Sequence, residues 1–137
     1  MLFDLENIFS KEQAVTTTAV STNVIKTATT TYGLTEISYG TPIPLVIQVV
    51  DDFVGATSVQ AEVQTATDEA FTTPVVLAQS PAVAVASLKA GYKFPINYIP
   101  KGNKGYLRLK YTVVGTATAG KITAGIVADH DNSYQDM

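Results

Sequence analysis

Alternation of apolar and polar residues with a period of two is the strongest pattern along this chain. In the segment 58–65, Val59, Ala61 and Val63 fall on one side of an extended backbone and polar residues fall on the other. The segment 106–113 repeats this pattern, with leucine, tyrosine and valine on one side and arginine and lysine on the other. Both segments are therefore predicted to be half-buried β-strands.

Further strands are predicted on both sides of these two. The nearly continuous apolar run 43–50, entered through prolines, is typical of a central strand. The segment 121–128 also alternates, and the glycines at 115–120 predict a hairpin that pairs it with 106–113. Weaker candidates are the segments 20–28, 75–79, 83–88 and 92–98. Together they make about eight strands.

Glycine and proline recur about every ten residues between these segments, which favours a sandwich or a barrel. A chain of 137 residues is one domain's worth of sequence. We therefore expect an all-β, single-domain antiparallel β-sandwich at residues 16–128. An N-terminal arm or short helix is expected at residues 1–15, and a polar C-terminal tail at 129–137.

The N-terminal segment is the best candidate for binding a partner. It has five large apolar residues within nine positions, namely Leu2, Phe3, Leu5, Ile8 and Phe9. Leucine and phenylalanine recur at helical spacing, and Ser10 with Gln13 is compatible with a capping box. An arm that docks on a neighbouring molecule would have the same pattern, and so would a lid over the protein's own sandwich.

Composition excludes several classes of function. With Lys+Arg 9 against Asp+Glu 12, the formal net charge is -3, which disfavours binding to nucleic acid or to an anionic membrane. No window has the length and apolar character of a membrane span, and no secretory signal is recognisable, so we expect synthesis in a cytoplasm. The chain has no Cys and one His, which leaves little for metal, cofactor or acid–base chemistry.

The acidic residues do not form an obvious catalytic pair. Asp51 and Asp52 are adjacent at a predicted strand end, so their side chains point to opposite faces. Asp68 precedes Phe71 in a predicted loop, where a turn-forming aspartate beside an anchoring aromatic residue explains both. His130, between two aspartates, is the one metal-like grouping, but it lies in the polar tail. We therefore expect no catalytic residues, metal or cofactor.

Seven tyrosines without any tryptophan raise the question of a ligand platform. By alternation Tyr111 points inward and Tyr106 outward, while Tyr92 and Tyr98 flank Pro95. They do not form one aromatic face, so core and interface packing is the favoured interpretation.

Several strings, in order from Phe9 to Ala128, resemble a known family, the capsid cement proteins of Bordetella podophage type. They are Phe9-Ser10-x-x-Gln13-Ala14-Val15-Thr16, Ser21-Thr22-Asn23-Val24-Ile25, Leu77-Ala78-Gln79-Ser80-Pro81, Leu88-Lys89-Ala90-Gly91-Tyr92, Tyr106-Leu107-Arg108-Leu109-Lys110-Tyr111 and Gly115-x-x-Thr118-Ala119-Gly120-Lys121-Ile122-Thr123-Ala124-Gly125-Ile126-Val127.

The resemblance implies a jelly-roll β-sandwich on the outside of a tailed-phage head, acting as a homodimer that clamps neighbouring major capsid proteins without catalysis. The low charge and the apolar N-terminus are compatible with that role. Two alternatives remain at this stage. One is a carbohydrate-binding β-sandwich module of a virion, and the other is a small β-sandwich enzyme.

Overall fold

A computed structural model of the protein describes residues 3–27 and 40–128. Strands dominate this part of the chain, and its only helical element is the short 3-10 helix η1. In chain order the elements are β1 (Phe3–Ala14), β2 (Ala19–Val20), β3 (Ile25–Lys26), β4 (Ile43–Ala66), β5 (Val75–Gln79), β6 (Val83–Ala84), η1 (Val85–Ser87), β7 (Tyr98–Ile99) and β8 (Tyr106–Val127).

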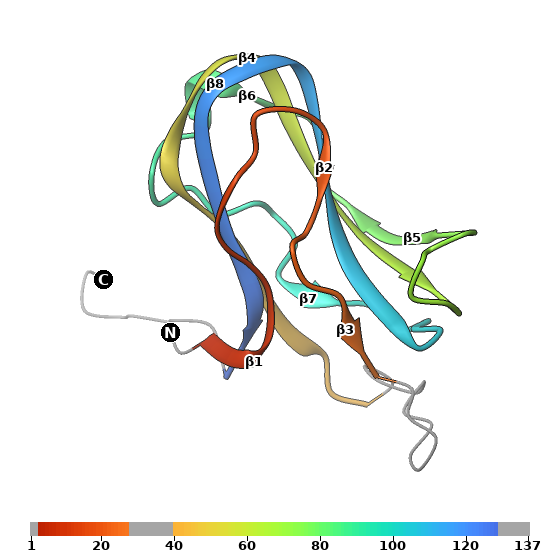
Figure 1. The fold of residues 1–137 in the computed structure, drawn as a ribbon. Helices are drawn as coiled ribbons and strands as arrows, with labels where there is room; N and C mark the ends of the chain where they lie inside the picture. The colour runs from red at the N-terminus through yellow and green to blue at the C-terminus, as the bar shows by residue number, and fades with distance from the viewer. Residues whose placement is uncertain (1–2, 28–39, 129–137) are drawn as a thin grey trace, which may run out of the picture.

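The strands form a ribbon of four antiparallel lengths of chain (Figure 1). Strand β8 pairs with β4 along nearly its whole length, from Leu45 opposite Ile126 to Ala66 opposite Tyr106. On its other side, β8 pairs with β1, β2 and β3 in turn. The far side of β4 pairs with β5, β6 and β7. Residues 3–27 and 75–99 therefore form the two edges of the ribbon.

This ribbon folds over across its middle (Figure 1). Gly55, Gly115 and Gly120 have φ values of 92°, 85° and 146°, which residues with a Cβ rarely adopt. The register between β4 and β8 shifts repeatedly near these glycines, between Val49 and Ser58. Each long strand consequently contributes its two halves to two different layers.

The two layers have the strand order of a jelly roll. One layer contains β1, the C-terminal half of β8, the N-terminal half of β4, and β7. The facing layer contains β2 and β3, the N-terminal half of β8, the C-terminal half of β4, and β5. Two such sheets made by folding one antiparallel ribbon define a jelly-roll sandwich, as expected.

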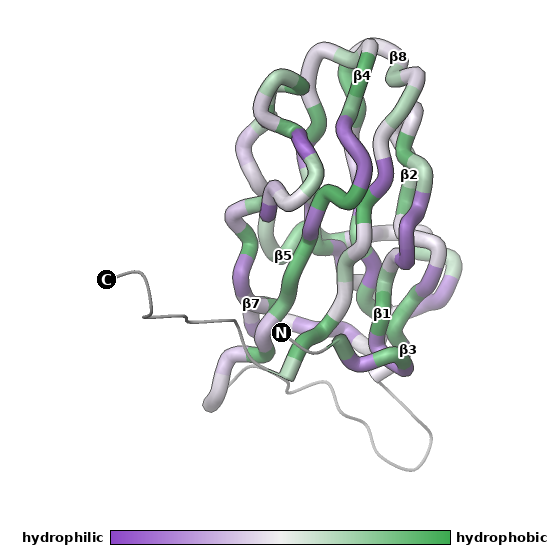
Figure 2. The backbone as a smooth tube through the Cα atoms, turned by 90° about the vertical axis from the view of Figure 1, so that its left-hand side faces the viewer, coloured by the Kyte–Doolittle hydropathy of each residue, from purple (hydrophilic) through white to green (hydrophobic). Residues whose placement is uncertain are grey.

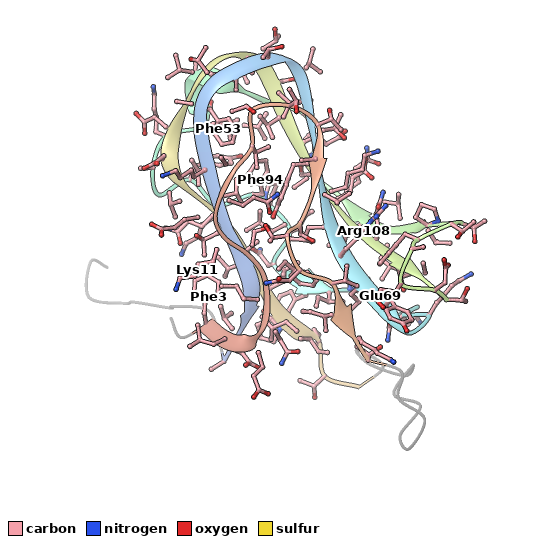
Figure 3. All side chains as sticks on the ribbon, viewed as in Figure 1. Phe3, Lys11, Phe53, Glu69, Phe94 and Arg108 are labelled. Atoms are coloured by element: carbon pink, nitrogen blue, oxygen red, sulfur yellow. The ribbon has the colours of Figure 1, made fainter. Side chains whose placement is uncertain are left out.

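Alternate residues of both layers fill the core. The predicted inward set of 58–65 is fully buried, and so are the matching positions of β8, including Leu107 and Leu109. Phe53 and Phe94 lie between the layers in the half of the sandwich nearest the fold-over (Figure 3). Burying each such side chain contributes about 1.5–3 kcal/mol, so period-two patterning is what stabilises the sandwich.

The predicted hairpin between 106–113 and 121–128 is wrong. The two segments are one continuous strand, β8, and they lie in different layers. Gly115 and Gly120 bend the strand instead of reversing it, because β4 stays paired with it beside both glycines, at Ala56 and Val54. The strand that pairs with β8 along its length is β4, which is distant in sequence.

The weaker strand predictions are met to different degrees. The segment 75–79 is β5, as predicted. In the described part of 20–28, residues 20–27, regular strand is found at Val20 in β2 and in β3. Between them, Ser21 donates its backbone N–H to Leu109 of β8 and accepts from the Leu109 N–H through its hydroxyl. In 83–88 a strand of two residues leads into η1, and 92–98 makes one isolated bridge through Lys93 before Pro95.

The N-terminal residues form a strand where the sequence favoured an arm or a short helix. Residues Phe3–Ala14 are β1, which is paired with β8 and is therefore part of the sandwich. The helical interpretation is wrong because Phe9 packs in the core from an extended backbone. The polar tail predicted at 129–137 lies outside the described residues.

Candidate interaction surface

Strand β1 is fastened to the core by a buried hydrogen bond. The hydroxyls of Ser10 and Tyr111 lie 2.9 Å apart, and Ser10 donates to Oε1 of Gln13 at 2.7 Å. The Tyr111 phenol is therefore the donor to Ser10, since the single Ser10 proton is already used. Burial raises the pKa of Tyr111. The phenol stays neutral, so the contact is a hydrogen bond between uncharged groups.

Gln13 extends this contact to the next segment. Its Nε2 donates to the carbonyl of Val20 at 2.8 Å, and its Oε1 accepts from the backbone N–H of Thr22 at 2.9 Å. Ser10 and Gln13 are thus hydrogen-bonded as the sequence suggested, but they join two parts of a sheet edge and cap no helix. These hydrogen bonds hold the inner half of β1, residues 9–14, against its neighbours.

The outer half of β1, residues 3–8, has less regular pairing with β8. Between Phe3 and Ile8 the pairing with β8 shifts register, which is typical of a bulge. Asp4 accepts hydrogen bonds from the side chain of Asn7 at 2.6 Å and from the backbone of Glu6 at 3.0 Å. These bonds, that of Asn7 first, hold the pKa of Asp4 below its usual value. The carboxylate thus stabilises a local turn within the strand.

The five predicted contact residues have different surroundings. Phe9 is fully buried, so it is a core residue and offers no surface to a partner. Leu5 is 75% exposed, while Phe3 and Ile8 are half-buried. Leu2 lies outside the described residues. The structure therefore retains Phe3, Leu5 and Ile8 as candidates on one sheet edge.

A shallow hollow adjoins this edge where β1 begins and β8 ends. It has a volume of about 220 Å³ and is lined by Phe3, Asp4, Ile126, Val127 and Ala128. Phe3 points from β1 beside the end of β8 (Figure 3). Four of its five lining residues are apolar, so the hollow suits an aliphatic side chain better than a charged ligand.

The folded-over end of the sandwich is a second candidate surface, which the sequence analysis did not single out. Its exposed residues carry no charge and many are threonines. In Figure 2 this end is mostly white to green, the colours of intermediate to hydrophobic residues. The end is formed by residues 16–18, 54–57 and 114–119. Val54 and Val114 are about half exposed there. Burying such a surface against a partner costs no desolvation of ions. The clue in the sequence was the uncharged runs 53–61 and 111–120, which contain the glycines of the two bends.

The acidic residues have structural partners. Asp51 forms an ion pair with Lys121 at 3.2 Å, and Asp52 accepts from the backbone N–H of Ala90 at 2.7 Å and lies 3.6 Å from Lys89. These contacts brace the bend of β4. No three His, Cys, Asp or Glu residues gather into a possible metal site within residues 3–27 and 40–128. The grouping around His130 lies outside this part of the chain.

The loop between β4 and β5 confirms the predicted turn. Asp68 accepts hydrogen bonds from the backbone N–H and the hydroxyl of Thr72, and Phe71 is buried. The Arg108 guanidinium lies 4.2 Å from the centre of the Phe71 ring, and its Nε donates to Gln64 at 2.9 Å. Burial lowers the pKa of Arg108. The loop thus covers part of the outer face beside β5.

The described tyrosines are not gathered on one face. Tyr111 is buried, as its alternation predicted. Tyr92 packs edge-on against Phe94, and Tyr106 lies under the Lys26 ammonium group. The aromatic residues therefore serve packing, with no stacking platform among them.

The family model described as Bbp16 matches residues 9–126. The chain belongs to the Bbp16 family. Bbp16 is a Bordetella phage protein family. The matched span includes almost the whole sandwich, but it begins after the exposed Leu5 of β1.

No curated protein is significantly similar to the chain in sequence. Among the described residues, no helix has the length and apolar character needed to cross a bilayer.

Proposed function

We propose that this Bbp16-family protein is a non-enzymatic capsid cement protein, bound to the outside of a phage head and stabilising contacts between major capsid proteins. The observation that carries the proposal is membership in a phage protein family along residues 9–126. The jelly-roll sandwich and the low charge of the chain support it. Net negative charge also suits an outer surface, because a protein facing packaged DNA gains from a basic one.

In this proposal, the outer half of β1 and the uncharged folded-over end are the surfaces that touch the capsid. Leu5 is a large aliphatic residue in water, and the nearby start of the same strand lines a hollow made mostly of apolar groups. Each buried apolar side chain contributes about 1.5–3 kcal/mol. A few such anchors per copy, repeated over many copies, are enough to reinforce a shell.

We also propose that the protein acts as a homodimer, is made in the host cytoplasm, and uses no cofactor. Sandwich edges need covering, and a two-fold dimer does this with one self-complementary patch. The absence of cysteine and the single histidine in the sequence support a binding role over catalysis.

A reconstitution experiment tests the proposal. Purified protein is mixed with emptied, expanded heads that lack it, and cosedimentation and the resistance of the heads to heat are measured. Stoichiometric, saturable binding that raises the heat resistance is the expected result. Absence of binding would exclude the cement function, and a saturable signal on a glycan array would favour a carbohydrate-binding module instead.

A further inference from the structure

Strand β5 is a sheet edge that lacks the usual protection against strand pairing. It borders the layer at the end opposite β2 and β3, and its residues Val75–Gln79 include no charge. Val75 and Val76 are 40% and 46% exposed. Edge strands of soluble proteins are normally blunted by charges, by irregularity or by a covering segment.

The other edges carry such protection. Strand β1 is interrupted by three register shifts and carries the exposed charges Asp4, Glu6, Lys11 and Glu12. Strands β2 and β3 have two residues each, and Lys26 lies in β3. The edge formed by residues 91–99 is interrupted at Pro95 and carries the exposed Lys93. Of the four edges in the described part of the chain, β5 is the least guarded.

The backbone of β5 offers hydrogen-bonding groups on its free side. The backbone N–H of Ser80 donates to Ala61 of β4 at 2.8 Å, and its carbonyl accepts from the Gln60 side chain at 2.8 Å. Ser80 therefore directs both groups toward β4. Because successive residues of a strand direct these groups to opposite sides, those of Gln79 point away from the sheet.

We infer that β5 pairs antiparallel with β5 of a second copy. The β5-containing layer of one copy and that of the other then form one continuous sheet across a two-fold axis. This inference rests on the homodimer in the proposed function and names its interface. Two-fold pairing places uncharged residues of 75–79 opposite one another, so no like charges meet. A bulge at Leu77 turns that side chain toward Gly102 and leaves Val75 and Val76 exposed. The outward groups of Gln79 supply main-chain bonds, and the valines supply apolar contact.

Sedimentation velocity of the full chain at micromolar concentration tests the interface. The wild-type protein is expected at about twice 14.5 kDa. Gln79→Pro removes the outward N–H and leaves the pairing with β4 intact, since proline is tolerated where the missing donor faces solvent. This variant is expected near 14.5 kDa, with a dissociation constant raised at least about tenfold, the effect of losing about 1.4 kcal/mol.

A second variant, Val76→Lys, places like charges across the axis without removing a backbone group, and is also expected to be monomeric. The matched controls Gln79→Ala and Val76→Thr retain the N–H and the branched side chain, and both are expected to remain dimeric. Leu5→Lys, on the opposite edge, is expected to leave the dimer unchanged. A cooperative thermal unfolding transition in each variant shows that it is folded.

The outcomes separate the interface from the proposed function. A dimer that persists in Gln79→Pro and Val76→Lys, or that dissociates in Leu5→Lys, would overturn the β5 interface while leaving the homodimer. A monomeric wild type would overturn both, and binding to heads is then judged by the reconstitution alone. If a monomeric wild type binds heads but Gln79→Pro does not, the edge pairs with a strand of the coat protein.

Discussion

Gly120 determines how tightly β8 bends over the core. Its φ of 146° is unfavourable for residues with a Cβ, and a Cβ there would overlap the buried ring of Phe53. Gly120→Ala is therefore expected to lower the free energy of unfolding by roughly 2–4 kcal/mol, from backbone strain and overpacking. Urea denaturation measures this directly. Gly40→Ala, with no atom within 4 Å of the added methyl, should change stability by less than about 0.5 kcal/mol.

Tyr111 gives the sandwich a sensitivity to alkaline pH. Because its pKa is raised in the folded protein, the unfolded chain loses the phenol proton first, near pH 10. The stability contribution of neutral Tyr111 is complete below that pH and is lost as the pH rises above it. Tyr111→Phe should cost about 1 kcal/mol at neutral pH, through the lost hydrogen bond to Ser10. Melting curves from pH 7 to 11 should fall less steeply for the variant, and parallel curves would contradict this.

Strand β1 combines a structural half and an exposed half. Phe9 is a core residue, so Phe9→Ala should lower the free energy of unfolding by about 3–5 kcal/mol. Leu5→Ala should leave stability unchanged within about 0.5 kcal/mol but weaken binding to heads, since Leu5 is mostly in water in the free protein. Thermal melting and cosedimentation measure the two effects. A large loss of stability in Leu5→Ala would show that the whole strand is structural.

The hydrophobic pattern predicted the strands that have one buried and one exposed face. It missed features that depend on pairing between segments distant in the sequence. The alternation in 58–63 and 106–113 was correct because one face of each strand is buried. Gln64, which the pattern placed in water, is buried and accepts a hydrogen bond from Arg108. The assignment of Gly115–Gly120 to a hairpin failed because a glycine with positive φ can turn a chain or bend it. Only the ladder with β4 decides between these outcomes.

Contacts between distant segments also explain why the predicted contact residues differ in burial. Phe9 and Leu5 both count as apolar in the sequence, but the hydrogen bond between Ser10 and Tyr111 brings Phe9 into the core and leaves Leu5 outside. That contact spans 101 positions and has no local signal. The uncharged end is likewise assembled from three separate segments by the fold-over of the ribbon.

At the scale of the whole molecule, a map of the intact phage particle tests the capsid assignment most directly. A cement protein is expected to give density for this jelly roll on the outer surface of the head, bridging adjacent major capsid proteins, with the outer half of β1 or the uncharged end against them. Density for the sandwich inside the shell or in the tail, or its absence from purified particles, would exclude the cement function.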